Sequence, residues 1–588
     1  MCGIAGLMMA QGAPPDERAL DRMADALAHR GPDGRGRFVN GSVGLIHNRL
    51  SIIDLATGAQ PLDDGAGHVL VANAEIYNYI ELRRELGEHH FRTGSDCEVP
   101  LRLYAAAGLD FVDRLRGMYA LALCDVARRR LVLARDPFGI KPLYVATLSQ
   151  GVAFASEAQA LIAAGLIAPR LSPKARDELL ALQFTTARAT IFEGIERVLP
   201  GELLVIEDGR IVERRRRSVL PTEAPEPWSE REALARLDEV LKDSVSVHQR
   251  ADVPFGLFLS GGIDSATVLT MMARLNERPV RAYTIGFPGT GVHDERQEAK
   301  RLAHAVRAEH NEVPFAPDDF WRLLPTVAVA LDDPVADYAT VPTYRLAEVA
   351  RQDVKVVLSG EGGDELFAGY GRYRSLLRPW WLGGAKPMRA SHPFEGLGIL
   401  RELPRDWRAG LVEAERASER PEWDRLQRAQ ALDCADWLPH DLLPKLDRCL
   451  MAHGVEGRTP FLDPAVAQFA FRLPPSLKVR RGLGKWLLRR WLADKSHALE
   501  PFARKRGFTV PVGEWIAAEA SRLGPLLERQ PVIEELCRPG AVTQACKDAK
   551  GRSAQAVWRL LFFTLWHRRH MLGRMPAGDV FETLEQRV

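Results

Sequence analysis

Two glycine-rich turns, each directly after a short apolar run, constrain the fold of this 588-residue chain more than any other feature. The run 255–259 leads into Ser-Gly-Gly-Ile-Asp-Ser at 260–265, and the run 355–358 leads into Ser-Gly-Glu-Gly-Gly-Asp-Glu at 359–365. A helical pattern follows each turn, and another apolar run, 282–287, lies between them. Strand, turn and helix in alternation predict a parallel α/β sheet whose ligand site lies at the carboxyl ends of the strands.

The first turn has the properties of a phosphate-binding loop. Glycines let the backbone approach an anion, the helix N-terminus directs N–H groups at it, and Ser260 and Ser265 add hydroxyl donors. The turn lacks the Gly-Lys-Ser/Thr ending of a Walker A loop and is no dinucleotide fingerprint. Each turn carries an aspartate, Asp264 and Asp364, and carboxylates beside phosphates suit Mg²⁺. The alternative is that a glycine-rich turn serves only the packing of the fold. That interpretation is reasonable for a single loop but weak for two such loops at neighbouring strand ends.

Residues 1 to about 210 have the pattern of short strands interrupted by helices, which predicts an α+β sandwich of antiparallel sheets. The expected strands include 44–46, 68–71, 119–123 and 130–134, with helices over 16–29 and 79–86. The polar stretch 213–227, rich in arginine and then proline, indicates a domain boundary. We therefore expect domains over residues 1–212 and 228–588.

Two features near this boundary predict local structure. Four consecutive arginines, 214–217, have no interleaved aromatic residues, so a solvated strand end or linker is favoured over a nucleic-acid site. Ser229 and Glu232 have the spacing of a capping box, which predicts a helix that begins there and continues to about Arg250. The rest of the second domain, to residue 588, is expected to be mostly helical and to pack around the parallel sheet.

Cys2 carries the most specific chemistry in the first domain. Removal of the initiator methionine would place its thiol beside a free α-amine, which titrates near pH ~7.7–8.0 and accepts the proton of the thiol. Nucleophile and general base would then lie on one residue. A cysteine near a chain end is more often incidental, so this hypothesis depends on the motifs that follow it.

Charge and cysteine content exclude several classes of protein. Lys plus Arg number 79 and Asp plus Glu 77, a net charge of +2 that predicts neither nucleic-acid binding nor an anionic membrane surface. Seven scattered cysteines without a CxxC pair argue against a disulfide framework and a zinc site. No secretory signal or membrane-spanning run is recognisable. We expect a soluble, cytoplasmic protein.

Several motifs together resemble those of the glutamine-hydrolysing asparagine synthetases. The first turn is similar to the pyrophosphate-binding loop of N-type ATP pyrophosphatases, and SGEGGDELF at 359–367 to a second asparagine synthetase signature. The motifs that resemble a class II glutamine amidotransferase are MCGIAG (1–6), HRGPD (29–33), RLSIID (49–54), NAEIYN (73–78), SDCE (95–98) and RDPFGIKPLY (135–144). MAHGVEGRTPFLD (451–463) and KWLLR (485–489) extend the match. The resemblance covers most of the chain and implies an αββα N-terminal-nucleophile hydrolase sandwich fused to an ATP pyrophosphatase-like synthetase domain.

The resemblance implies a glutaminase site in the first domain. Cys2 would attack the amide carbon of glutamine, form a thioester and release ammonia. The side chain of Asn73 and the backbone N–H of Ala74 would stabilise the oxyanion. The implied glutamine-binding residues are Arg49 for the carboxylate, Glu75 and Asp96 for the α-ammonium, and the backbone of Leu50, Ser51, Ile52 and Ile53. A surface ion pair is the alternative interpretation of Arg49 and Asp96.

The resemblance implies a synthetase site in the second domain. The implied ATP-binding residues are Leu259, Ser260, Gly261, Gly262, Asp264, Ser265, Ile285, Ser359 and Gly360, with Mg²⁺ bound by Asp264 and Asp364. The β-carboxylate of aspartate would attack the α-phosphate and give β-aspartyl-AMP and pyrophosphate, a step that the family associates with the position of Glu361. Lys485 matches a lysine that stabilises charge on the phosphate and on the tetrahedral intermediate. Ammonia from an internal tunnel would then give asparagine and AMP.

Two residues depart from the pattern of that family. Ala74 and Ala368 stand where glycine is usual. An alanine at position 74 still offers its N–H, but it would be strained if the backbone there required a positive φ, with a less efficient glutaminase as the consequence. Ala368 follows the second turn and is expected to have a small effect.

Other functions stay open at this stage. The strongest alternative is a glutamine-dependent amidotransferase that acts on another carboxylate, such as a peptide, a sugar acid or a natural-product intermediate. The acceptor pocket decides between the two, and we expect it to be lined from residues 294–295, 445–448 and 456–458. A catalytically idle sensor of ATP or glutamine is disfavoured by the intact motifs. The expected partners are the small molecules glutamine, aspartate and ATP, without nucleic acid or membrane, and the family leaves a homodimer open.

Overall fold

Two antiparallel sheets form the centre of the N-terminal domain in the computed structural model, which describes residues 2–292, 294–378, 381, 388–496, 500–503 and 509–587. The first sheet has the strand order β10-β8-β9-β1-β3-β2 and the second β12-β11-β7-β6-β5-β4. The strands of the first sheet are β1 (Gly3–Met9), β2 (Gly34–Asn40), β3 (Val43–Arg49), β8 (Tyr144–Leu148), β9 (Gly151–Ala155) and β10 (Glu196–Arg197). Those of the second are β4 (Leu62–Asp63), β5 (His68–Ile76), β6 (Gly117–Asp125), β7 (Arg130–Arg135), β11 (Glu202–Glu207) and β12 (Arg210–Arg216).

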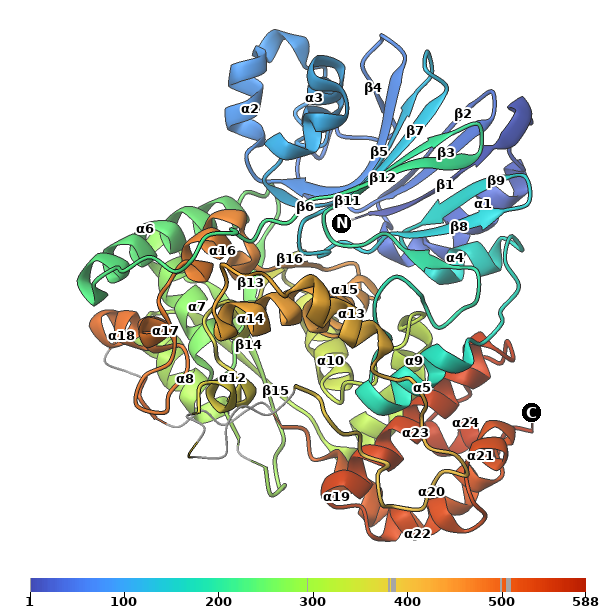
Figure 1. Ribbon diagram of the computed structural model, residues 1–588, viewed down its shortest axis with the longest axis vertical. Helices are drawn as coiled ribbons and strands as arrows, with labels where there is room; N and C mark the ends of the chain where they lie inside the picture. Colours follow the sequence, from blue (N-terminus) through green and yellow to red (C-terminus); the bar gives the residue numbers. More distant parts are fainter. Residues whose placement is uncertain are drawn as a thin grey trace.

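Helices cover the outer face of each sheet. α1 (Glu17–Ala26) and α4 (Ala158–Ala163) pack on the first sheet, with α5 (Pro173–Leu182) beyond them, and α2 (Tyr79–Leu86) and α3 (Glu98–Ala107) pack on the second. Apolar side chains from both sheets fill the space between them, because each strand alternates its side chains between two buried faces. The domain therefore has the αββα layers that the sequence predicts (Figure 1).

A five-stranded parallel sheet forms the centre of the second domain, with the order β15-β14-β13-β16-β17. Its strands are β13 (Phe255–Phe258), β14 (Arg281–Gly286), β15 (Glu309–Pro314), β16 (Val356–Leu358) and β17 (Glu456–Arg458). The three apolar runs predicted as strands correspond to β13, β14 and β16. β13 and β16 are neighbours, so the two glycine-rich turns that follow them leave the same edge of the sheet side by side.

Both faces of the parallel sheet are covered by helices, as parallel sheets require. The helices of this domain up to residue 495 are α6 (Glu230–His248), α7 (Ile263–Leu275), α8 (Arg296–Ala305), α9 (Pro317–Ala330), α10 (Thr340–Ala350), α11 (Gly363–Leu366), α12 (Gly371–Leu376), α13 (Ala409–Ala417), α14 (Arg425–Ala435), α15 (Leu443–Met451), α16 (Pro464–Phe471), α17 (Pro475–Lys478) and α18 (Trp486–Lys495). The predicted capping box is present: the Ser229 side chain accepts from the Glu232 N–H, and the Glu232 carboxylate accepts from the Ser229 N–H. These bonds satisfy two donors at the start of α6.

The arginine run near the domain boundary is a strand. β12 is the edge strand of the second sheet and extends to Arg216, so the run ends this strand rather than forming a linker. Its cations pair with nearby carboxylates, Arg214 with Glu196 at 3.0 Å and Arg217 with Asp110 at 3.0 Å. Charged residues on an exposed edge strand oppose pairing with another chain.

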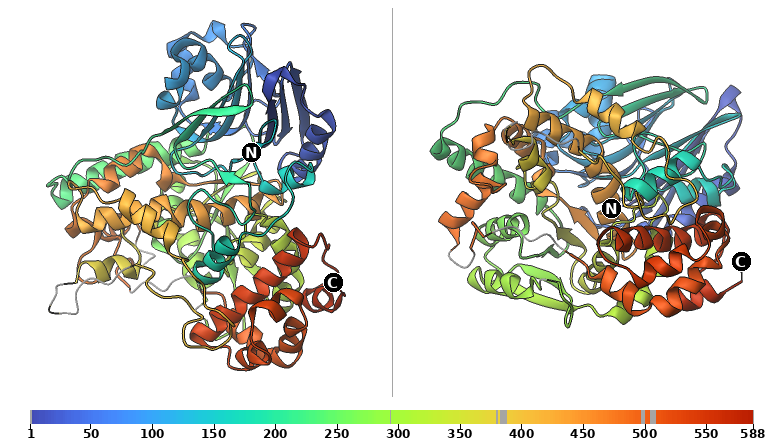
Figure 2. Two further views of the ribbon diagram at one scale, coloured as in Figure 1. Left: turned by 45° about the vertical axis from the view of Figure 1, so that its right-hand side comes forward. Right: turned by 60° about the horizontal axis from the view of Figure 1, so that its bottom comes forward.

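The C-terminal helices form a group at the end of the molecule opposite to α2 and α3 (red in Figures 1 and 2). They are α19 (Val512–Ala518), α20 (Ala520–Glu528), α21 (Pro531–Leu536), α22 (Ala541–Lys547), α23 (Gly551–His570) and α24 (Val580–Glu585). They pack on α9 and α5 through α23 and α24, and Trp515 of α19 contacts Phe287 and Phe315, which directly follow β14 and β15, so the group also packs at the end of the parallel sheet. In the part of the chain that the structure describes, no helix is both long and apolar enough to cross a membrane.

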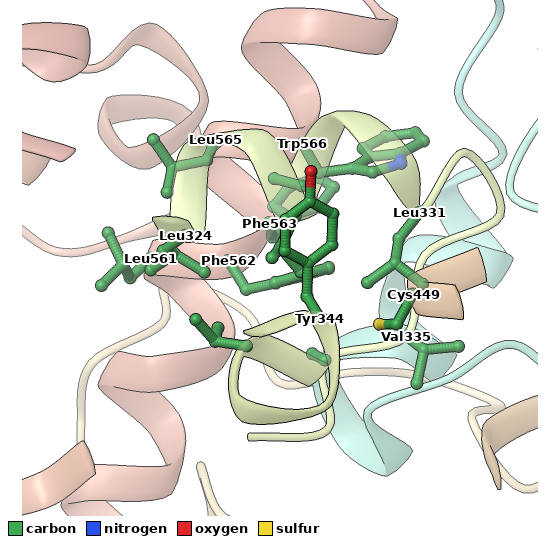
Figure 3. Packing of buried hydrophobic residues seen from close by; sticks show 14 of the residues in the cluster. Leu324, Leu331, Val335, Tyr344, Cys449, Leu561, Phe562, Phe563, Leu565 and Trp566 are labelled. Carbon is green, nitrogen blue, oxygen red and sulfur yellow. The ribbon is translucent and has the colours of Figure 1, made fainter. Parts of the chain in front are cut away.

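α23 fixes a loop that contributes to the domain interface. Its residues Leu561, Phe562 and Trp566 lie among side chains of α9, α10 and α15 (Figure 3), where each buried side chain of this size contributes about 1.5–3 kcal/mol. The Trp566 indole N–H donates to the carbonyl of Asp332 at 3.0 Å, and that of Trp558 to the carbonyl of Ala336 at 2.7 Å. The loop from residue 332 to 336 is therefore held from the C-terminal side.

Candidate active sites

Cys2 lies directly before β1, and its thiol is buried. Its backbone N–H donates to Oδ1 of Asn73 at 2.9 Å, and its Sγ lies 4.0 Å from the carbonyl oxygen of Leu50. Burial raises the pKa of the Cys2 thiol above its usual value. The thiol therefore needs a base in order to become a nucleophile. Met1, whose removal would free the α-amine, lies outside the described residues.

Asn73 presents an amide group to Cys2. The residue lies on β5 and is fully buried, and its Nδ2 has no hydrogen-bond partner among the described residues. A buried donor left without a partner costs about 1–3 kcal/mol, so such groups commonly await a ligand. The side chain of Asn73 thus contacts the backbone of Cys2 through its oxygen and keeps its N–H₂ group available as a donor.

Ala74 follows on β5 in ordinary strand backbone. Its φ is not positive, and it pairs in register with Tyr119 of β6. Its methyl group belongs to the apolar cluster that includes Val99 and Leu101 of α3. The strain that a positive φ would impose on alanine does not arise here, and its backbone N–H is retained.

The segment after β3 lies beside the thiol. The Arg49 guanidinium donates to the backbone carbonyls of Asp54 and Leu55, and the Ser51 N–H donates to Asp33 at 2.8 Å. The carbonyl of Leu50 faces the Cys2 sulfur, while Ile52 is buried and Ile53 half-buried. The fold thus brings the predicted glutamine-binding segment, residues 49–53, to the predicted nucleophile.

The two carboxylates predicted to bind an ammonium have different environments. Asp96 is buried and accepts from the Ile76 N–H at 2.7 Å, and burial raises its pKa to about 6. Glu75 is also buried, but its carboxylate pairs with the Arg458 guanidinium of β17 at 2.8 Å. The structure therefore brings Asp96 to the Cys2 side of the domain and gives Glu75 a counterion in the second domain.

The first glycine-rich turn lies between β13 and α7. The Ser265 hydroxyl accepts from the Ser260 N–H at 3.1 Å, and the Gly262 N–H donates to the Ser260 hydroxyl at 3.1 Å. The Gly261 N–H donates to Glu295 at 3.2 Å. These bonds hold the loop in one conformation at the N-terminus of α7, where an anion is favoured. Leu259 and Ile285, predicted to contact the nucleotide base and ribose, are buried directly after β13 and within β14.

The two turns contact each other through glycine. A Cβ at Gly360 would lie 2.8 Å from the Cβ of Asp264 and 2.9 Å from the N of Ser265. No residue with a side chain fits that distance without displacing the backbone. Ser359 precedes Gly360, and its buried hydroxyl has no hydrogen-bond partner among the described residues. A polar surface formed by both turns results.

Lys485 joins the two turns. Its ammonium pairs with Asp364 at 2.7 Å and with Asp264, and the side chain is 2% exposed, so the pairs are shielded from water. Burial acts to lower the pKa of Lys485, but the two carboxylates outweigh it and raise the pKa. The residue has a φ of 57° and lies directly before α18. The sequence predicts a role for Lys485 only through the resemblance to the family. No local pattern predicts its left-handed backbone conformation.

Glu361 lies near a second lysine. Its carboxylate is 3.9 Å from the Lys445 ammonium, which also binds Asp337 at 3.0 Å. Burial raises the pKa of Glu361, opposed by Lys445. Lys445 therefore reaches the site as expected for an acceptor-pocket residue, and Asp337 is a neighbour that the sequence analysis missed.

The other regions expected to line the acceptor pocket have different neighbours, and Glu295 reaches the first glycine-rich turn, where it accepts from the Gly261 N–H. Asp294 pairs with Arg296, and Arg448 binds Asp332 at 2.9 Å. Glu456 and Arg458 form the buried strand β17 and bind each other at 2.6 Å. Residues 456–458 therefore belong to the contact between the domains.

The sequence matches known families along both domains. Residues 236–568 match the asparagine synthase family, and residues 1–216 match the glutamine amidotransferase domain. The chain belongs to the asparagine synthase family. It is an enzyme of this ligase family, with an amidotransferase domain and a synthase domain, and the resemblance seen in the sequence is confirmed.

Three relatives indicate the range of this family. A putative glutamine-hydrolyzing asparagine synthetase of Mycobacterium tuberculosis is 37% identical and spans 96% of this chain and 97% of its own. Glutamine-hydrolyzing asparagine synthetase 1 of Bacillus subtilis is 32% identical over 99% of this chain and 100% of its own. Amidase chry2 of Gibberella zeae is 30% identical over 82% of this chain and 84% of its own.

Buried ion pairs join the amidotransferase domain to the synthase domain. Arg30 donates to the carbonyl of Cys2 at 3.2 Å and binds Glu157 and Asp447, each at 2.8 Å. Arg197 binds Asp333 through two bonds of 2.7 Å. Burial without pairing would be very unfavourable for these ions, so the contact has one defined geometry. The carboxylates that bind Arg30 and Arg197 are all more than a hundred residues away from them in the sequence. Of these residues, only Arg30 belongs to a motif that the sequence alone reveals.

Polar atoms without a partner also occur along this interface. The Tyr77 hydroxyl and the Thr459 hydroxyl are buried and have no hydrogen-bond partner in the described part of the chain. Asn73 Nδ2 in the amidotransferase domain and the Ser359 hydroxyl in the synthase domain share this property. Buried unsatisfied groups are uncommon in folded proteins. Of these four residues, Asn73 contacts Cys2, Ser359 belongs to the second glycine-rich turn, and Tyr77 and Thr459 directly follow β5 and β17.

Proposed function

We propose that this enzyme makes asparagine from aspartate and ATP with ammonia taken from glutamine, and releases glutamate, AMP and pyrophosphate. Residues 1–212 would be the glutaminase domain and residues 228–588 the synthetase domain. The observation that carries the proposal is that Lys485 pairs with one aspartate from each of the two glycine-rich turns. In a chain of the asparagine synthase family, this pairing supports a nucleotide-binding site at this edge of the parallel sheet.

Glutamine hydrolysis begins at Cys2. Without Met1, the neutral α-amine takes the thiol proton, and Sγ attacks the amide carbon of glutamine. Nδ2 of Asn73 and the backbone N–H of Ala74 stabilise the oxyanion. The α-ammonium then returns the proton to the amide nitrogen, and the intermediate collapses to a thioester as ammonia leaves. Arg49 binds the carboxylate of glutamine and Asp96 its α-ammonium, with Glu75 beside Asp96. Water then hydrolyses the thioester to glutamate.

Ammonia would cross the buried interface without contact with bulk water, where it would be protonated and diluted. The four buried polar atoms without partners support such a route, because they offer hydrogen bonds to a small polar molecule.

The acceptor is activated at the edge of the parallel sheet. The turn from Ser260 to Ser265 binds pyrophosphate, and Leu259, Ile285, Ser359 and Gly360 hold the adenosine part of ATP. The β-carboxylate of aspartate attacks the α-phosphorus, and pyrophosphate leaves in line. Ammonia attacks the resulting acyl-adenylate, AMP leaves, and Glu361 accepts a proton from the incoming nitrogen. Lys485 stabilises negative charge on the phosphate and on the tetrahedral intermediate.

Asp264 and Asp364 are suited to hold Mg²⁺. Both bind one ammonium group in the structure, so their carboxylates are close together, and Mg²⁺ commonly takes one or two carboxylates together with nucleotide phosphates. Among the described residues no group of three or more His, Cys, Asp or Glu side chains could hold a metal ion, which is consistent with a cation shared with ATP. Bound Mg²⁺ would neutralise charge on the departing pyrophosphate.

Product analysis tests this proposal directly. Purified enzyme without Met1 is given aspartate, glutamine and MgATP, and asparagine, AMP and pyrophosphate are measured by mass spectrometry. We expect all three in equal amounts, and we expect Cys2→Ala to form them only from added ammonia. Glutamine hydrolysis without consumption of aspartate would show that the acceptor is another carboxylate. Absence of AMP with every acceptor and nitrogen source would contradict a ligase.

A further inference from the structure

Arg458 contacts both Glu75, near the candidate glutaminase site, and Ser359, in the second glycine-rich turn. It lies on β17 at the edge of the parallel sheet, opposite Leu358 of β16 in the parallel register, and its carbonyl accepts from the Ser359 N–H at 2.8 Å. The backbone position of Arg458 therefore helps to set where β16 ends and where the second glycine-rich turn begins.

The side chain of Arg458 reaches into the amidotransferase domain. Its Nη2 lies 2.8 Å from the carboxylate of Glu75, which follows Asn73 and Ala74 on β5. Both side chains are buried, Arg458 completely. A displacement of this end of β5 would therefore act on the guanidinium, because the two charged groups are buried and in direct contact, where their attraction is strong.

The remaining N–H groups of Arg458 are held rigidly. Nε binds Glu456 at 2.6 Å, and Nη1 donates to the carbonyls of His248 and Arg250 at 2.9 and 2.8 Å. Burial acts to lower the pKa of Arg458, but Glu75 and Glu456 outweigh it and raise the pKa, so the group stays charged. Hydrogen bonds from Nε and Nη1 fix the plane of the guanidinium, while Nη2 makes no hydrogen bond among the described residues and interacts with Glu75 as an ion pair. The single ammonium of a lysine cannot reproduce this arrangement.

We propose that Arg458 is a positioning residue that couples glutamine hydrolysis to nucleotide binding. Occupation of the glutaminase site shifts the end of β5, the Glu75–Arg458 pair transmits this shift to β17, and the Ser359 N–H bond passes it to the second turn. Coupling of this kind is reciprocal, so ATP bound at the turns also changes the affinity for glutamine. The inference rests on the proposed function only for the identity of the two ligands.

The test is glutamine hydrolysis with and without MgATP, measured without any acceptor. For the wild-type enzyme we expect MgATP to change kcat/KM for glutamine by about fivefold, at the lower end of typical couplings. In Arg458→Lys and Arg458→Met, the ratio of kcat/KM for glutamine with MgATP to that without MgATP falls to about one, and this loss arises mainly from KM for glutamine. Ammonia-dependent synthesis by the same variants stays closer to the wild-type rate. Arg197→Lys is the matched control, since it also changes a buried interdomain arginine but contacts neither β5 nor β17.

Three results would overturn the inference: a wild-type enzyme that does not respond to MgATP, Arg458 variants that keep the full response, or an equal loss in Arg197→Lys. A second measurement needs no variant and covers the case in which these fail to fold. Alkylation of Cys2 by a glutamine-like diazoketone should change amide hydrogen exchange of the peptide from 358 to 363, and an unchanged rate would contradict the relay. Because glutamine hydrolysis and hydrogen exchange are both measured without aspartate, a wrong acceptor leaves these two readouts unaffected and appears only in ammonia-dependent synthesis and in the product analysis.

Discussion

The ammonium of Lys485 lies 2.7 Å from the carboxylate of Asp364 and pairs in the same place with Asp264. One cation, directly before α18, thus binds an acidic residue from each of the two turns that follow neighbouring strands of the parallel sheet. The arrangement neutralises part of the charge that the two turns bring together, and it places a donor where phosphate oxygens are expected.

Removal of this cation should abolish synthesis selectively. Lys485→Met leaves two carboxylates without their shared counterion and removes a donor to the transition state, so we expect AMP formation to fall by about 10²–10³-fold. Glutamine hydrolysis without MgATP should stay within twofold of wild type. Lys495→Met, on the exposed side of the same helix, is the control, and an equal loss there would point to damage of α18 rather than to chemistry.

A methyl group added at Gly369 should have a similar effect. A Cβ there would lie 1.8 Å from Oδ1 of Asp364 and 2.2 Å from Cε of Lys485, so Gly369→Ala must force the pair apart. Misplacement of catalytic groups by about 1 Å can cost about 10²-fold in rate. The rate of AMP formation with added ammonia measures this, and normal activity in Gly369→Ala would show that the pair is dispensable.

The neighbouring position gives the matched control. Ala368 has a φ of 57° and is fully buried. Ala368→Gly relieves about 1–2 kcal/mol of left-handed strain. It also loses about 0.8 kcal/mol of methyl burial and about 0.5–1 kcal/mol of chain entropy. These terms nearly cancel, so we expect unchanged activity and a free energy of unfolding within about 1 kcal/mol of wild type in urea titrations.

The dependence of glutamine binding on pH should follow Asp96. Burial raises the pKa of Asp96 to about 6, and only its ionised form attracts the α-ammonium of glutamine. As the pH falls from 7 to 5 the ionised fraction drops about tenfold, so KM for glutamine should rise by about the same factor. Asp96→Asn should have a high KM at both values, and an unchanged KM in the wild type at pH 5 would place the ammonium elsewhere.

Buried and exposed interdomain ion pairs should contribute very differently to stability. Asp447→Ala removes one buried carboxylate from Arg30 and from Arg448, which keep only Glu157 and Asp332, and breaking a buried ion pair typically costs about 3–5 kcal/mol. Lys355→Ala breaks the half-exposed pair with Asp33, 2.9 Å long, which is worth at most about 1 kcal/mol, and leaves the bond from the Ser51 N–H to Asp33 in place. Unfolding by urea compares the two variants, and similar losses would contradict the assigned burial.

Much of the fold follows from local sequence. β13, β14 and β16 are short apolar runs before glycine-rich turns, and such runs in alternation with helices specify a parallel sheet. The capping box at Ser229 specifies the start of α6 with the same certainty. Among the residues of the glutaminase motifs, Asn73, Leu50 and Arg30 contact Cys2 in the structure.

β17 shows what the sequence alone does not reveal. Its residues, Glu-Gly-Arg at 456–458, have low strand propensity and would be expected at a surface or a substrate pocket. They form a completely buried strand because the counterion of Arg458 comes from Glu75 of the other domain. The partners of Arg30 and Lys485 are likewise hundreds of residues away, and no periodicity or spacing predicts them.

The bonds of Arg30 have a consequence for the order of events during translation. This residue holds the carbonyl of Cys2 and is itself held by Asp447, which is synthesised more than four hundred positions later. A nascent chain that has completed both antiparallel sheets still lacks that anchor. Arg30 can bind Glu157 as soon as the amidotransferase domain is complete, but it gains its second carboxylate, and with it the full set of bonds behind Cys2, only when α15 has left the ribosome.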